Sequence, residues 1–376
     1  MRFVVPVVLA VASVPAQTYV VDALNGPGAN FTQIAAAIPA VPDGAVLLVR
    51  PGHYASFAIT GKSLTILGGV GVTFGETFAG NIGIDALAPG QRVVVHGLQP
   101  LLGDPVAVAT VTCNACQGEV LLDAIAWGPP GGVALEVNQC AQVFVTNCTF
   151  GGNPVPYGAR FVASDVTVVD TNLGGGFAGT SGLVQVGGRV HFAGVHVTGV
   201  GSFSTGGPAV SMQGGALRID SVSSLVGGLT PLPTGNGRAI DGTGSVRYHP
   251  GTVMQGAIPV IAPTIAAVPI ALPVLHATGG QIGAPATATL EAIGGTFAFL
   301  LLGLPGPAVT FPGLSDPLSV WNAALVAYGV MAPPLTAVVN VPSVPALVGQ
   351  TFVWQGLAIN ANGTWNPSNA VWFVLR

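Results

Sequence analysis

The sequence predicts an all-β protein in two parts: a right-handed parallel β-helix with an N-terminal capping helix, followed by a small β-sandwich. Three observations support this fold class. A strand-like segment recurs every 23 to 29 residues, the chain consists largely of short apolar runs, and 55 of the 376 residues are glycine and 31 are proline. Glycine and proline are the poorest residues in a helix interior, so long helices are not expected.

The repeated segment has four residues, of which the second and fourth are apolar and the third is variable. Alternation with a period of two indicates a strand with one buried face. A coil of this length cannot bury its apolar side chains alone, and stacking of coils builds a continuous core. We therefore expect Val143, Val166 and Val190 to lie directly above one another. The segments begin at Ser63, Arg92, Glu119, Gln142, Asp165, Arg189 and Ala216.

A turn is expected after each segment, because a polar residue that favours turns follows several of them. Examples are Asp123, Asn147, Asp170 and Asp220. The next apolar position predicts a second short strand, and it recurs as Leu98, Ile125, Cys148, Val195 and Val222.

The ends of the predicted β-helix are marked by changes of pattern. Residues 31–38 have helical spacing and stop at Pro39, which predicts a capping helix that covers the open end of the stack. Residues 45–49 then form the first rung. The β-helix is expected to span 17–250, because the register is lost from about Pro250.

Residues 251–272 are expected to be a proline-rich linker, and residues 273–376 a β-sandwich. Apolar runs separated by Gly/Pro turns return in this last part, as in small sandwiches. Residues 360–363 (NANG) predict a hairpin turn before the last strand. The runs cover 276–278, 286–290, 296–302, 337–341, 351–359 and 370–375.

The N-terminus predicts a secretory signal peptide over 1–16. Arg2 provides the positive start, 3–14 the apolar region, and 14–16 (VPA) a cleavage site. The apolar stretch is too short to span a bilayer and contains Pro6. Residues 257–275 contain four prolines, which argues against a second span. We therefore expect a secreted or cell-surface protein without a transmembrane segment in the mature chain.

Charge is scarce, with 6% charged residues and a formal net charge of −4. A nucleic-acid partner would require clustered arginine and lysine, so none is expected. No polybasic run indicates binding to a membrane surface.

The four cysteines fit an oxidising compartment. Cys113 and Cys116 have a zinc-like spacing, but no second pair of ligands completes a metal site, and no metal is predicted. A step of one 23-residue coil back from Cys140 reaches the position beside Cys116. Cys116 and Cys140 are therefore expected to be close enough for a disulfide, with buried thiols as the alternative.

The opening of the chain resembles the pectin-lyase-like superfamily, and pectin methylesterases in particular. The resemblance rests on 21–38 (VDALNGPGANFTQIAAAI), 41–44 (VPDG), 49–54 (VRPGHY) and 62–68 (KSLTILG), and on 132–137 (GVALEV) and 141–151 (AQVFVTNCTFG) in a middle coil. It covers about 20–230 and implies a right-handed parallel β-helix. These are scaffold motifs shared by catalytic and non-catalytic members. The C-terminal part resembles modules of secreted bacterial repeat proteins.

The resemblance does not extend to catalytic motifs. Pectin methylesterases act through two aspartates and an arginine, one aspartate in a Gln-Asp-Thr motif shortly after a coil like 141–151. In this chain 151–160 (GGNPVPYGAR) contains no acid, and an Asp-Phe motif is absent. No catalytic residue and no cofactor is therefore assigned.

One possible polar groove remains, formed by Asp165, Asp170, Arg189 and Arg218. Lyase chemistry would use such acids with an arginine base, whereas surface ion pairs and solvated turns explain the same residues without a function. Sugar-stacking aromatics are a further possibility at Trp127, Phe150, Tyr157, Phe177 and Phe203, with core packing as the alternative.

Taken together, the sequence favours a secreted, non-catalytic β-helix protein acting as a cell-surface or carbohydrate-interaction module. Its expected partners are polysaccharide or cell-envelope components. The alternative is a divergent polysaccharide lyase or carbohydrate esterase. Four or more charged side chains converging in one groove would favour the enzyme, and a groove of aromatics and amides would favour binding.

Overall fold

The computed structural model describes residues 16–376 except 76–78, 101–107, 128–132, 152–156, 177–178, 203–204, 221–222, 232–234, 271–272, 292–294, 310–311, 313, 316–317, 331–333 and 361–362. The predicted signal peptide, apart from Ala16, lies outside the described residues. The chain divides into two compact units. The first comprises Gln17–Arg247 and Gly251–Val268, and the second Pro269–Arg376 with Tyr248–Pro250.

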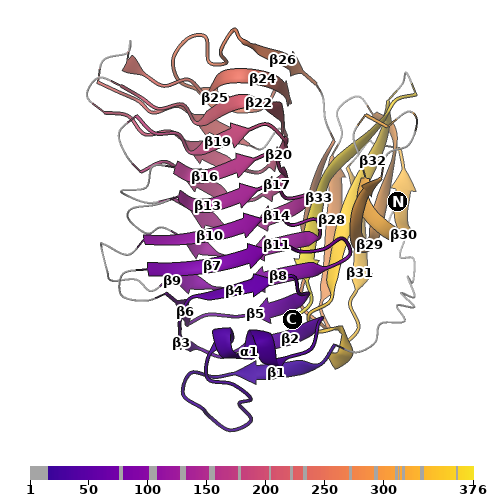
Figure 1. Ribbon diagram of the computed structural model, residues 1–376. Helices are drawn as coiled ribbons and strands as arrows, with labels where there is room; N and C mark the ends of the chain where they lie inside the picture. The colour runs from indigo at the N-terminus through magenta and orange to yellow at the C-terminus, as the bar shows by residue number, and fades with distance from the viewer. Residues whose placement is uncertain are drawn as a thin grey trace. The chain divides into compact units, whose positions relative to one another are not determined.

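The first unit is a parallel β-helix, in which equivalent strands of successive coils pair side by side (Figure 1). Its first column contains all seven repeated segments. Its strands are β1 (Thr18–Val21), β2 (Ala45–Val49), β5 (Leu64–Leu67), β8 (Arg92–His96), β11 (Glu119–Asp123), β14 (Gln142–Thr146), β17 (Asp165–Val169), β20 (Arg189–Ala193) and β22 (Val210–Ile219).

Two further columns complete the coils. The second precedes the first within each coil: β4 (Phe57–Thr60), β7 (Ala79–Asp85), β10 (Val108–Asn114), β13 (Val133–Asn138), β16 (Tyr157–Val162), β19 (Leu183–Val186), β24 (Ile240–Tyr248) and β26 (Ile265–Pro269). The third contains β3 (Gly52–Tyr54), β6 (Val72–Phe74), β9 (Gln99–Pro100), β12 (Ala126–Trp127), β15 (Thr149–Phe150), β18 (Asn172–Gly174), β21 (His196–Thr198), β23 (Ser224–Val226) and β25 (Val253–Gln255).

The predicted register of the first column is confirmed. Val143 pairs with Val166, and Val166 pairs with Val190. These side chains are 0%, 3% and 2% exposed, so they form one continuous interior column. Each fully buried valine contributes about 1.5–3 kcal/mol, so the repeated pair of apolar positions stabilises the stack at every coil. The all-β class and the parallel stacking of coils are thus as predicted.

The second and third columns also follow from local chemistry. In coils such as those of β13–β14 and β16–β17, a single residue in the left-handed conformation separates the second column from the first, and another separates the first from the third. In the latter turn Asn147 (φ 52°) and Asp170 (φ 45°) occupy equivalent positions, as expected for residues that tolerate this conformation. The N–H of Asn147 donates to Val169 O (3.1 Å) and that of Asp170 to Ala193 O (2.9 Å), so each turn is bonded to the next coil.

The N-terminal end is capped by α1 (Ile34–Ala40), with Ile34, Ala37 and Ile38 buried. The helix begins three residues later than predicted and includes Pro39 in its last turn. Lys62, the only lysine, donates from Nζ to Ile38 O (2.7 Å) and to Val41 O. Lys62 thereby supplies a hydrogen-bond donor to carbonyl groups at the C-terminal end of α1, where the helix itself offers no N–H partner.

Residues 251–268, expected in a linker, instead continue the β-helix through β25 and β26. Ile240 N donates to Val260 O (3.1 Å) and Ala262 N donates to Ile240 O (3.0 Å). Backbone pairing persists here although Pro259 and Pro263 break the side-chain alternation on which the sequence-based boundary depended.

Glycines stack closely in the later coils. A Cβ atom at Gly237 would lie 2.0 Å from Gly207 O, one at Gly206 would lie 2.0 Å from Gly228 O, and one at Gly201 would lie 1.9 Å from Leu229 O. We call Gly201, Gly206, Gly207, Gly228 and Gly237 the glycine stack. Adjacent coils are in backbone contact there, with no room for a side chain.

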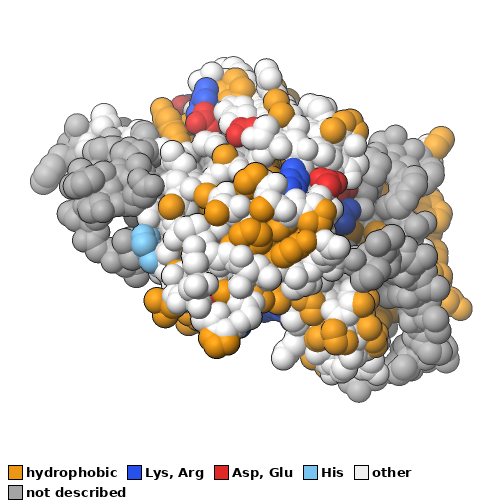
Figure 2. Space-filling view, turned by 60° about the horizontal axis from the view of Figure 1, so that its bottom comes forward, with side chains coloured by type: hydrophobic (Ala, Val, Ile, Leu, Met, Phe, Trp, Pro, Cys, Tyr) orange, Lys and Arg blue, Asp and Glu red, His pale blue; other side chains and the backbone are white. Residues whose placement is uncertain are grey.

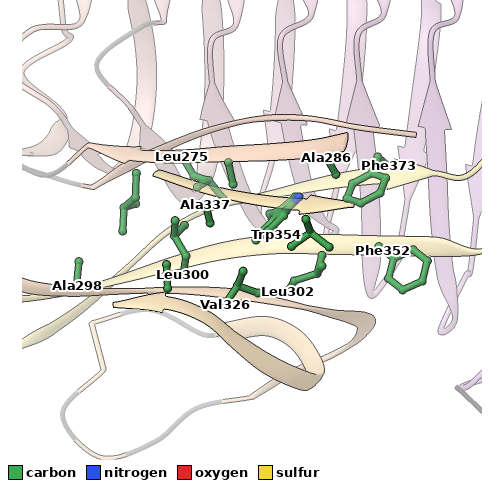
Figure 3. Close-up of a cluster of buried hydrophobic side chains, with 14 of the residues drawn as sticks. Leu275, Ala286, Ala298, Leu300, Leu302, Val326, Ala337, Phe352, Trp354 and Phe373 are labelled. Carbon is green, nitrogen blue, oxygen red and sulfur yellow. The ribbon is translucent and has the colours of Figure 1, made fainter. Parts of the chain in front are cut away.

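The second unit is an antiparallel sandwich of two sheets. One has the order β27 (Val274–Thr278), β28 (Pro285–Glu291), β31 (Leu335–Asn340). The other has the order β30 (Leu318–Gly329), β29 (Gly295–Val309), β32 (Thr351–Asn360), β33 (Trp365–Val374). Their facing side chains share one core, which includes Leu275, Leu300 and Trp354 (Figure 3).

All six apolar runs fall on strands. The runs 286–290 and 351–359 match β28 and β32 to within one residue at each end, whereas β27, β29, β31 and β33 begin earlier or end later than their runs. The predicted hairpin is confirmed, because β32 and β33 pair antiparallel and Gly363 N donates to Asn360 O (2.9 Å). β30 was not predicted. Its pairing with β29 contains register shifts at three places, and these shifts remove the period-2 pattern from its sequence.

Candidate functional site

The outward face of the first column carries a row of paired charges. Positions 92, 119, 142, 165 and 189 form one row of this face. Arg92 Nε lies 2.6 Å from Glu119 Oε2. Arg189 Nε lies 3.1 and 3.2 Å from the two carboxylate oxygens of Asp165, with a further bond from Nη2. Each acid therefore faces a base on the adjacent coil.

A second charged group, which we call the His191 cluster, consists of His191, Arg218 and Asp220. His191 pairs with Arg218 across β20 and β22, two residues along the strand from Arg189. Asp220 follows β22. His191 Nε2 lies 3.2 Å from Asp220 Oδ2, and Arg218 Nε lies 3.6 Å from Asp220 Oδ1. The side chain of Asp220 is 0% exposed, so this carboxylate depends on its two partners.

The two partners keep Asp220 ionised. Burial alone would raise the pKa of this carboxyl. The electrostatic attraction of His191 and Arg218, together with their hydrogen bonds, outweighs burial and lowers the pKa of Asp220 below its ordinary value. Within the cluster, Asp220 is thus an ionised carboxylate, balanced by Arg218, that orients the imidazole of His191. Such a pair can move a proton only where a substrate reaches His191, whose side chain is 19% exposed.

The four residues of the predicted groove occupy three different positions on the coils. Asp165 and Arg189 are joined as expected. Arg218 lies in the next row and belongs to the His191 cluster. Asp170 lies in the left-handed turn after β17. The sequence-based groove does not include Asp220 or His191. Two signals point to them: His191 occupies the position equivalent to Arg218 one coil earlier, and Asp220 follows Arg218 by two residues and so has the same parity.

Other polar groups form ladders between coils. His96 Nδ1 lies 2.8 Å from Asp123 Oδ2, and Thr146 Oγ1 and Asn147 Nδ2 donate to Asp123 Oδ1 at 2.8 and 2.9 Å. Burial would raise the pKa of Asp123, but the hydrogen bonds from His96 and Asn147 lower it. A similar ladder connects Asp85, Asn114 and Asn138. All of these groups bond to neighbouring coils, so both ladders support the stack.

The four cysteines are buried and present as free thiols. Cys116 and Cys140 are hydrogen-bonded through their side chains, which agrees with the predicted proximity. The hydrogen bond from Cys140 lowers the pKa of Cys116 and, with burial, raises the pKa of Cys140. A disulfide between Cys116 and Cys140 remains a prediction, because both are thiols in the structure.

The suggested sugar-stacking aromatics do not form a described groove on the β-helix. Phe150 is fully buried, which matches the core alternative, and Tyr157 is partly buried. Phe177, Phe203 and the side chain of Trp127 lie outside the described residues.

Ion pairing is the common feature of the acids in the described part of the chain. Seven carboxylates have a basic partner: Asp22, Glu119, Asp123, Glu136, Asp165, Asp220 and Asp241. On the face drawn in Figure 2, acidic and basic side chains likewise occur together in small groups on a largely uncharged surface. Among the described residues no three His, Cys, Asp or Glu side chains are grouped so as to hold a metal ion. Nor is any described helix long and apolar enough to cross a membrane.

Comparisons with known proteins give little further information. No protein-family profile matches the chain, and no curated protein matches it. Among solved structures the chain is similar to the chitinase ChiW of Paenibacillus sp. str. FPU-7, described as a cell-surface-expressed multi-modular enzyme machinery, at 10% identity and a TM-score of 0.17. The match covers 88% of this chain and 24% of that chain, so this chain spans about a quarter of the enzyme's length. At this TM-score the likeness supports no statement about function.

Proposed function

We propose that the protein is a secreted, non-catalytic β-helix protein that acts as a cell-surface or carbohydrate-interaction module. The observation that carries the proposal is the pairing of carboxylates with bases one coil away. Glycoside hydrolysis requires two placed carboxylates, one of them free to give or take a proton. In the outward row the carboxylates of Glu119 and Asp165 are each engaged by an arginine of the adjacent coil, so neither carboxylate stands apart from a basic partner.

Two expectations from the sequence form part of the proposal. The predicted signal peptide supports secretion, and the scaffold motifs at 21–68 and 132–151 support membership in the pectin-lyase-like superfamily. That superfamily includes members without catalytic motifs, which agrees with the absence of those motifs here.

The test is a polysaccharide array on which the purified protein is scored for binding and for product release together. We expect binding without release of reducing ends, unsaturated ends or methanol, with or without calcium. Turnover of any polymer would refute the non-catalytic assignment.

A divergent lyase or esterase is the second candidate, and the His191 cluster is the observation that favours it. If the array shows turnover, the variants His191→Ala and Arg189→Ala separate two sites. Loss in the first variant alone would assign the activity to the His191 cluster, and loss in the second alone would assign it to the outward row. Arg238→Ala removes a different surface pair, with Asp241, and serves as the matched control.

A further inference from the structure

The second unit exposes a group of aromatic rings on the sheet β30–β29–β32–β33. Phe297 and Phe299 alternate with Ala298 and Leu300, which enter the core. Their side chains therefore point to the opposite, outer face. Ile359 pairs with both Phe297 and Trp365, and Tyr328 pairs with Phe299. Residues paired directly across a sheet share a face, so all four aromatic residues lie on the outer face. We call them the aromatic platform.

The rings of the platform contact one another. The centroids of Phe297 and Phe299 are 5.2 Å apart, and those of Phe297 and Tyr328 are 6.1 Å apart. The rings of Phe299 and Trp365 are parallel within 3° at 5.8 Å. Tyr328 is 58% exposed and Trp365 is 37% exposed, while the two phenylalanines are partly exposed. Mutual contact restricts the rings, so ordering them on binding costs little entropy.

The chemistry around the platform is neutral. The four strands of the sheet contain no lysine, arginine, histidine, aspartate or glutamate. The nearby polar groups are amides and hydroxyls, such as Asn360 and Thr364 beside Trp365. A charged polymer would gain no complementary charge here, whereas hydroxyl groups find donors and acceptors next to the apolar rings.

The size of the platform also limits its occupant. A fully exposed aromatic side chain presents roughly 200 Å². Because the four side chains are only partly exposed, their exposed surfaces total about 300 Å². A stable interface between two protein copies buries about 800 Å² on each. An exposed apolar patch of about 300 Å² is within the range that is often functional on a monomer. It matches a short run of sugar rings better than a second copy of this chain.

We propose that the aromatic platform of Phe297, Phe299, Tyr328 and Trp365 is a binding site for a neutral polysaccharide. The ligand's C–H-bearing ring faces pack on the electron-rich aromatic faces, and its hydroxyls bond to the neighbouring amides. This proposal rests on the proposed carbohydrate-interaction function, and it assigns that function to the second unit rather than to the β-helix.

The test uses the full chain in native affinity gels that contain hydroxyethylcellulose or xyloglucan as neutral probes and polygalacturonate as the charged probe. We expect retardation by a neutral probe and none by polygalacturonate. Trp365→Ala and Tyr328→Ala should each weaken binding about tenfold, the effect of about 1.4 kcal/mol per lost ring contact. Trp365→Phe and Tyr328→Phe should retain most of the affinity because they keep a ring. Val338→Ala, at a 43% exposed position on the other sheet, is the matched control.

The outcomes distinguish the two proposals. If a neutral probe retards the wild type and both alanine variants equally, the platform is not the site, while the carbohydrate-interaction function stands. Retardation by polygalacturonate alone would likewise overturn the platform. If no polysaccharide retards the wild type, both proposals fail. A dimer in sedimentation experiments that Trp365→Ala dissociates would replace the polysaccharide with a second copy of the chain.

Discussion

Replacing Gly237 by alanine tests the close contact of coils in the glycine stack. The added Cβ would lie 2.0 Å from Gly207 O and 2.4 Å from Gly207 C, whereas real Cβ contacts essentially never fall below 3.0 Å. The coils must therefore separate locally by about 1 Å. The bonds from Gly228 N to Gly207 O (2.8 Å) and from Gly237 N to Gly228 O (2.9 Å) join these segments. A shift of this size would take both beyond the usual hydrogen-bond distance.

Two lost backbone bonds cost about 1–3 kcal/mol, and the lower entropy of alanine in the unfolded chain offsets about 0.4–1 kcal/mol. We expect Gly237→Ala to lower the free energy of unfolding of the β-helix by about 1 kcal/mol. The matched control is Gly69→Ala, because a Cβ atom added at Gly69 would meet no other atom within 4 Å and the residue has no left-handed φ. It should be neutral or slightly stabilising.

The assay is the midpoint of guanidinium unfolding by far-UV circular dichroism, together with hydrogen exchange of peptides covering 199–238. Gly237→Ala should lower the midpoint and speed exchange in those peptides, while Gly69→Ala should change neither. If the two variants unfold at the same midpoint as the wild type, the backbone contact does not limit the stability of these coils.

Three further predictions concern the interior of the β-helix. Val166→Ala should destabilise it by about 2–3 kcal/mol in guanidinium unfolding because it opens a cavity in the valine column, whereas the outward Thr167→Ala should cost under about 1 kcal/mol. Treatment with oxidised glutathione should join Cys116 to Cys140, and peptide mapping would detect the bond. In the treated variant Cys116→Ser, Cys140 should remain a free thiol that reacts after unfolding. Four free thiols in the treated wild type would contradict the pairing. In the folded protein the pKa of Asp220 lies below its unfolded value of about 3.9. The contribution of Asp220 to the free energy of unfolding is therefore complete above that pH and is lost as the pH falls further. Acid unfolding of Asp220→Asn should therefore depend less on pH below about 4 than that of the wild type.

The sequence was sufficient for the register of the first column, because parity and spacing alone place Val166 above Val143. The strands of the second column were not predicted as a repeat, since their sequences, such as those of β10 and β19, share no single pattern. The sandwich strands were visible where alternation is regular, and β30 was hidden where register shifts interrupt it.

The candidate sites show the same limit. The pair Asp165–Arg189 follows from spacing because both residues lie in the register of one row. The His191 cluster also depends on Asp220, which lies beyond the end of β22. Strand spacing does not predict the contact between Asp220 and His191, because Asp220 is outside the paired register. The aromatic platform joins Phe299 and Trp365 across an intervening strand, so only the antiparallel register reveals it.

The one-residue left-handed turns have a consequence for the length of the molecule. Since the backbone N–H of each turn donates to the equivalent position of the next coil, a duplicated coil inserted between two existing ones would find the same backbone partners above and below. Each such insertion should lengthen the stack by one strand spacing, about 4.8 Å. Evolution or an engineer can therefore set the length of this β-helix in fixed steps, by adding or removing whole coils, without altering the shape of those that remain.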